Sequence, residues 1–265
     1  MVGNKELITP KLAREYLALN KNIRTISPAW VRYFSLILQR GEFQLTPDGV
    51  CFNVDGRLVN GQHRLQAIAD TGISAEMMVY HNVTEPQLRA QDLGRKRTVA
   101  DHLAEDRRVV DVLSAGVRLG TGLSVHPLSY VDTLMQDEPG FAAQYLVRHC
   151  GTTAKYFSSA NWKLGAVVQM VSGADWRQVA DLYRHLVTMD LEELPPVGMA
   201  IVRQVFSGMA SAADRTDTLA RSLVVFDPAK ASNTKVQVGD AQKASARETV
   251  RAVIGAYLPR EEVGQ

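Results

Sequence analysis

The segment Gly61-Gln62-His63-Arg64 has the residue types that bind an anion at the start of a helix. A short apolar run ends at Asn60, Gly61 permits a tight turn, and helical spacing begins at Gln62. The backbone N–H groups at a helix start are unpaired, and the helix dipole favours negative charge there. We expect His63 to donate to a phosphate oxygen and Arg64 to bind one through its forked guanidinium. The pattern predicts a site for a nucleotide polyphosphate; a plain strand-to-helix turn, whose arginine binds a nearby carbonyl or carboxylate, stays open as the alternative.

Glu42, Asn22 and Arg24, which precede this segment in the chain, are candidates for the same chemistry. Glu42 follows a predicted helix, where its carboxylate is expected to act as a general base or to hold Mg²⁺ beside a phosphate. Asn22 and Arg24 lie between two predicted helices, a position suited to contacts with a nucleobase or a phosphate. The alternative for the three is an ordinary exposed glutamate, a turn-forming asparagine and a surface arginine.

The densest basic cluster of the chain is Arg95, Lys96 and Arg97. It precedes Thr98, which is predicted to cap a helix with Asp101 in the first turn, so a phosphate of a nucleotide or of a DNA backbone would be favoured there. A solvated loop with scattered positive charge is the alternative. No histidine spacing indicates a metal site, and we predict none.

The elements that would position these residues can be read from caps and turns. Thr9-Pro10 and Ser27-Pro28 each start a predicted helix, and the second helix ends at Gly41. Two short apolar runs, 49–54 and 57–60, are joined through Asp-Gly, which is typical of a hairpin. A helix follows Gly61, and a further strand is expected near 75–80.

The pattern changes near Glu105, after which helical spacing continues almost throughout. We predict an α+β fold with a domain at 1–105 and an all-helical domain at 106–265. The helices expected in the second domain lie around 107–119, 127–136, 139–149, 161–172, 175–189, 197–212, 215–224 and 241–257.

Composition restricts the function classes. The 265 residues include 30 Lys and Arg and 28 Asp and Glu, and a net charge of +2 excludes a protein that binds nucleic acid through phosphate neutralisation alone. Two cysteines are too few for a disulfide scaffold, and no run of about 18 apolar residues is found. These features predict a cytoplasmic protein with reduced thiols and no membrane partner.

The segment DGRLVNGQHRLQAI resembles the GQHR box of the ParB/sulfiredoxin-like superfamily, and residues 8–105 resemble ParB-like proteins of bacteria, phages and mobile elements. The resemblance implies a small mixed sheet with flanking helices that binds a nucleotide, and a setting in DNA modification within a bacterium or a phage-infected cell. The sequence departs from the family at two places. Gln62 stands where sulfiredoxins have their catalytic cysteine, which excludes their chemistry, and Asn60 replaces the commoner aspartate.

Two functions from different classes follow. The first is an ATP-type phosphohydrolase or phosphotransferase, with Mg²⁺ as an expected companion of the nucleotide and DNA or a modified DNA base as a second partner. The second is a non-catalytic DNA-binding regulator, which the balance of 17 basic and 17 acidic residues after Glu105 makes the weaker hypothesis. A helical domain that forms a homodimer is a third. In the enzyme, the catalytic candidates are Glu42 and His63, and the phosphate or nucleotide contacts are assigned to Asn22, Arg24, Gly61, Gln62, His63, Arg64, Arg95, Arg97 and Thr98.

Overall fold

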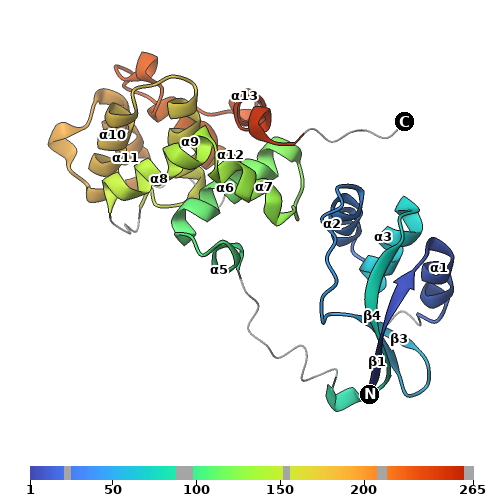
Figure 1. Ribbon diagram of the computed structural model, residues 1–265. Helices are drawn as coiled ribbons and strands as arrows, with labels where there is room; N and C mark the ends of the chain where they lie inside the picture. The colour runs from blue at the N-terminus through green and yellow to red at the C-terminus, as the bar shows by residue number, and fades with distance from the viewer. Residues whose placement is uncertain (21–24, 88–97, 152–155, 208–213, 260–265) are drawn as a thin grey trace. The chain divides into compact units, whose positions relative to one another are not determined.

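The computed structural model describes residues 1–20, 25–87, 98–151, 156–207 and 214–259, and the chain divides into two compact units, Met1–Lys96 and Arg97–Gln265 (Figure 1). The first unit mixes helices with a small sheet, and the described parts of the second are helical, which confirms the predicted α+β class. The division falls before α5 (Val99–Leu103), because this short helix packs against α6 (Arg107–Thr121).

The first unit contains a four-stranded sheet in the order β1-β4-β2-β3. β1 (Val2–Ile8) runs antiparallel to β4 (Ala75–Val83), and β4 runs parallel to β2 (Val50–Asn53). β2 and β3 (Leu58–Asn60) form the predicted antiparallel hairpin. The strand predicted near 75–80 is also present, whereas β1 precedes every element that the sequence predicted.

Three helices pack with this sheet in the described part of the first unit: α1 (Pro10–Ala18), α2 (Pro28–Gln39) and α3 (Gln62–Thr71). Residues 85–87, after β4, are also helical. α3 contacts both α1 and α2 (Figure 1). Their apolar side chains form one core with the sheet, and its fully buried members include Ile8, Val50, Leu58, Leu65, Ile68 and Val79. Because Leu58 and Leu65 lie on either side of Gly61, this core fixes the turn between β3 and α3.

The second unit contains all eight helices that the sequence predicted after Glu105. They are α6, α7 (Leu128–Met135), α8 (Glu138–Cys150), α9 (Ala160–Val171), α10 (Trp176–Thr188), α11 (Pro196–Phe206), α12 (Arg215–Val225) and α13 (Asp240–Val253). α9 is the central one, because it contacts α6, α8 and α12. Gly165 lets α9 approach α12 closely, and the Ser222 hydroxyl donates to the Trp162 carbonyl at 2.7 Å.

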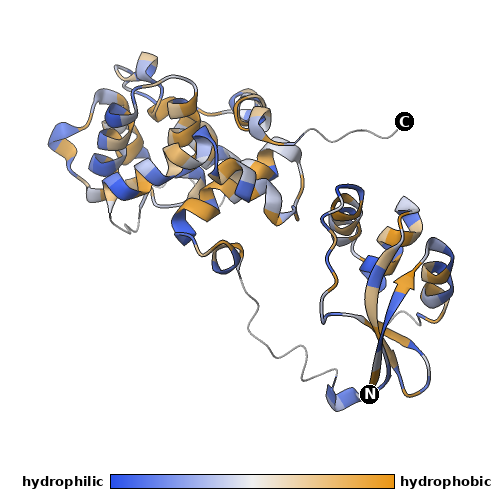
Figure 2. Cartoon of the chain, viewed as in Figure 1, coloured by the Kyte–Doolittle hydropathy of each residue, from blue (hydrophilic) through white to orange (hydrophobic). Residues whose placement is uncertain are grey.

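Hydrophilic residues recur along the described helices of both units (Figure 2). None of these helices combines the length and the apolar character that are needed to cross a bilayer. Cys51 and Cys150 are buried free thiols, one in each unit.

Asp214 links α12 to α13 through an ion pair, and we expect its carboxylate to make the stability of the second unit depend on pH in the acid range. Its carboxylate caps α12 and accepts from Lys243 Nζ at 2.8 Å, and the Lys243 bond, together with bonds from backbone N–H groups, lowers the pKa of Asp214 to about 2. The folded state therefore binds this proton more weakly than the unfolded chain, whose value is 3.8. We expect the contribution of Asp214 to stability to be complete above pH 4 and lost as the pH falls towards 2. Urea unfolding between pH 5 and 2 checks this: Asp214→Asn should flatten the pH dependence. Asp175→Asn should not, because it keeps the cap acceptor and removes the charge of a carboxylate that has no ammonium partner among the described residues.

Candidate functional site

The turn between β3 and α3 has the geometry that the GQHR segment predicted. Gly61 has φ 99° and ψ −1°, a conformation that side chains with a Cβ rarely adopt, and α3 begins at the next residue without a side-chain cap. A Cβ at this position would lie 3.0 Å from Val50 Cα, so the turn rests directly on β2. Glycine is therefore required here both by the backbone conformation and by the close approach.

The start of α2 meets the start of α3. The backbone N–H of Ser27, the N-cap of α2, donates to His63 Nε2 at 2.9 Å, and Ser27 makes no side-chain cap bond either. Both helices therefore direct the positive ends of their dipoles into one region, here called the α2–α3 junction and defined by Ser27 and residues 61–64. Because Nε2 accepts, the proton of the neutral ring lies on Nδ1, and His63 positions one helix start against the other.

Arg64 supplies a cation to this junction. Its Nη2 donates to the Gly49 carbonyl at 3.4 Å, and its Cζ lies 5.9 Å from the centre of the Phe34 ring. Burial lowers the pKa of Arg64, an effect that the nearby Asp48 carboxylate opposes, and the guanidinium remains charged at neutral pH. Among the described residues, no carboxylate lies within 4 Å of it. A partly buried cation that makes no direct ion pair with the described residues favours the binding of an anion.

Gln62 presents an unsatisfied donor at the first position of α3. The residue is 3% exposed, and within the described part of the chain its Nε2 has no hydrogen-bond partner. A buried amide in this state costs about 1–3 kcal/mol, so it calls for an explanation. An acceptor oxygen from a ligand would provide one.

The other predicted residues are placed differently. Glu42 follows the C-terminal end of α2, about 18 Å along the helix from Ser27, and its Oε1 lies 2.7 Å from Arg40 Nε. Its role as a general base stays a prediction. Thr98 belongs to the second unit, where it forms a capping box with Asp101: Oγ1 accepts from the Asp101 N–H at 3.2 Å and donates to Oδ2 at 2.8 Å. Asn22, Arg24, Arg95 and Arg97 lie outside the described residues.

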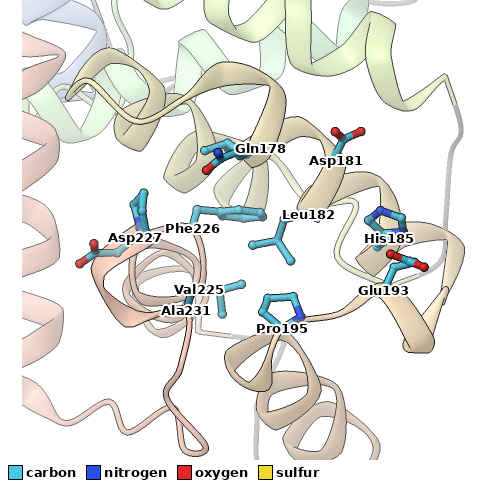
Figure 3. Close-up of a pocket in the computed structure, with 12 residues that line it drawn as sticks. Gln178, Asp181, Leu182, His185, Glu193, Pro195, Val225, Phe226, Asp227 and Ala231 are labelled. Atoms are coloured by element: carbon cyan, nitrogen blue, oxygen red, sulfur yellow. The ribbon is translucent and has the colours of Figure 1, made fainter.

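A cavity of about 350 Å³ in the second unit has no counterpart in the sequence predictions (Figure 3). Leu182, Val225 and Phe226 give it an apolar lining, and His185 and Glu193 lie together at one side of it. His185 Nδ1 is 3.0 Å from Asp190 Oδ2, which orients the ring. The lining comes from four separate elements, so no local sequence pattern predicts the cavity. Asp181, Glu193 and Asp227 add carboxylates to the lining.

No group of three or more His, Cys, Asp or Glu side chains within the described ranges is placed to hold a metal ion. The chain matches no protein-family model, no curated protein and no solved structure.

Proposed function

We propose that the first unit binds the phosphates of a nucleoside triphosphate, ATP foremost, at the α2–α3 junction, and that the protein hydrolyses the nucleotide or transfers its phosphoryl group. The observation that carries the proposal is the cation of Arg64, which comes from the first turn of α3 and lies partly buried against Phe34 and the Gly49 carbonyl, without a carboxylate within 4 Å among the described residues. The resemblance of the GQHR segment to the ParB/sulfiredoxin-like superfamily supports a nucleotide as the source of the anion. The same resemblance is our reason to propose DNA modification as the setting.

The chemistry follows from what the junction offers to a phosphate. Phosphate oxygens would accept from the backbone N–H groups at the start of α3 and from the amide of Gln62, and Arg64 would stabilise the charge that the phosphoryl group carries during transfer. Transfer to water yields a nucleoside diphosphate and inorganic phosphate, and transfer to a hydroxyl yields a phosphate ester. Mg²⁺ is the expected companion of the triphosphate.

Arg64→Gln tests the proposal, because glutamine retains a donor but removes the charge. We expect the Kd for ATP, measured by calorimetry on the full chain, to rise by about 10- to 100-fold, the usual effect of losing a charged hydrogen bond. ATP turnover should fall with it.

The matched control is Arg57→Gln, which removes an exposed arginine from the turn of the neighbouring hairpin and should leave the Kd unchanged. Circular dichroism of both variants monitors folding. Failure of the wild-type chain to bind any nucleoside triphosphate, or equal effects of the two substitutions, would refute the proposal.

Gln62→Met tests the unsatisfied amide separately. Methionine has a similar length and shape but no polar hydrogen, so the ligand-free protein should gain about 1 kcal/mol of stability while ATP binding weakens. Gln66→Met on the same helix is the control, because the Gln66 amide already donates to Asp70 Oδ1 at 2.7 Å. Stability is measured by hydrogen exchange of α3. Loss of stability in Gln62→Met would show that the amide is satisfied within the folded protein.

A further inference from the structure

A second cavity of the helical unit has a volume of about 310 Å³ and a mostly polar lining, and it lies at the starts of α9 and α12. Ser159, Ala160 and Asn161 line it from the start of α9, and Arg215 and Thr218 line it from α12. Asn161 Nδ2 donates to the Arg215 carbonyl at 2.7 Å and so ties the two helix starts together. The remaining lining residues, Asp111 and Arg118, come from α6.

The two arginines of this cavity are exposed residues of α6 and α12. Among the described residues, no carboxylate lies within 4 Å of the side chain of Arg118 or of Arg215. The Asp111 carboxylate is engaged by Arg107 Nε at 3.7 Å. Burial and then the like charge of Arg215 lower the pKa of Arg118, and Asp111 opposes them. The lining therefore has an excess of one positive charge, from two arginine cations and the one carboxylate of Asp111.

The groups around the cavity do not neutralise this excess. The Asp214 carboxylate, which caps α12, is already bound by Lys243 Nζ at 2.8 Å and by the N–H groups of Thr216 and Asp217. Arg247 adds a further cation from α13, where its Nη2 donates to Thr216 Oγ1 at 3.0 Å.

We propose that this cavity binds a phosphate monoester, with Arg118 and Arg215 as its principal ligands. A monoester carries nearly two negative charges at neutral pH, which matches the two arginines. The backbone N–H groups at the start of α9 add donors to the same oxygens. The cavity is as large as the smaller ligand sites of proteins, so it has room for part of the molecule that bears the phosphate. This proposal does not depend on nucleotide binding by the first unit.

The test is a titration of the full chain with inorganic phosphate, followed through the Nε–H resonances of ¹⁵N-labelled arginines. It is run on the wild type and on Arg64→Gln, so that binding in the first unit is recognised separately. We expect saturable shifts of the Arg118 and Arg215 signals with a Kd of about 1 mM, and an increase of about tenfold in this Kd for Arg118→Gln and for Arg215→Gln. Arg177→Gln, which alters an exposed arginine on α10, is the control and should leave the Kd unchanged.

The source of the phosphate is resolved by two further titrants, glycerol phosphate and a 5′-phosphorylated oligonucleotide, the latter compared with its 5′-hydroxyl form. Preference for glycerol phosphate supports the site with a small-molecule ligand, and preference for the phosphorylated oligonucleotide supports it with a nucleic-acid end. Linear shifts without saturation, or an unchanged Kd in both arginine variants, would overturn the proposal.

Discussion

Replacing Gly61 with alanine is expected to lower the free energy of unfolding of the first unit by about 3 kcal/mol and to abolish binding at the α2–α3 junction. Two physical costs add together. The backbone at φ 99° disfavours any residue with a Cβ, and the new Cβ would lie 3.0 Å from Val50 Cα and 3.1 Å from its Cγ2. A buried strand backbone cannot rotate away as a flexible side chain can, so α3 itself must shift and carry His63 and Arg64 with it.

Gly72→Ala provides the matched control, because it changes the glycine at the other end of the same helix. Gly72 also has a positive φ, 74°, but a Cβ there would meet nothing within 4 Å. We expect about 1 kcal/mol from backbone strain alone and unchanged ligand binding. Hydrogen exchange of β2 and α3 in the full chain measures both variants, and Gly61→Ala should accelerate exchange about 100-fold relative to wild type. Equal effects of the two substitutions would contradict a role for the close approach to Val50.

The order of helices and strands in the first unit could largely be predicted, because the residues that specify their turns and caps are close together in the sequence. Asp55-Gly56 specifies the hairpin turn, where Gly56 has φ 73°, and Thr9 caps α1 by accepting from the Leu12 N–H at 3.2 Å. The eight helices after Glu105 were also predictable, since apolar periodicity and acidic or hydroxyl caps recur at their starts. Such signals act within a few residues and need no tertiary contact.

Long-range contacts explain what could not be predicted. β1 is a mostly exposed edge strand whose sequence, VGNKELI, lacks a clear alternation, and its partner β4 lies more than 60 residues away. The GQHR segment identified the start of α3 but not its contact with Ser27, which is 36 residues distant. Nor could it reveal that the Gln62 amide is buried without a partner, because burial depends on the packing of the whole unit. The cavities of the helical unit were missed for the same reason.

Arg221 is expected to matter most to the stability of the second unit. It is 9% exposed on α12, and its Nε donates to Asp217 Oδ2 at 2.6 Å. Its Nη1 donates to Gln204 Oε1 at 2.7 Å and to the Val236 carbonyl at 3.3 Å, which joins α12 to α11 and to the segment before α13. Arg221→Met should cost about 3–5 kcal/mol, because it leaves the buried Asp217 carboxylate with only the more distant Lys243 Nζ, at 3.9 Å, and removes a donor from two further acceptors.

Thermal unfolding of the full chain measures this effect, and the transition of the second unit should fall by about 10 °C. The double substitution Asp217→Leu with Arg221→Met distinguishes the cause: since it removes both charges, it should recover a large part of the stability that Arg221→Met loses. Lys230→Met is the surface control, because its partner Asp227 lies at 3.2 Å in an exposed pair that should contribute less than about 1 kcal/mol. If the double variant is no more stable than Arg221→Met, the loss comes from the hydrogen bonds to Gln204 and Val236. In that case Arg221 stabilises the unit as a link between elements, and the loss of its charge beside Asp217 is not what destabilises the variant.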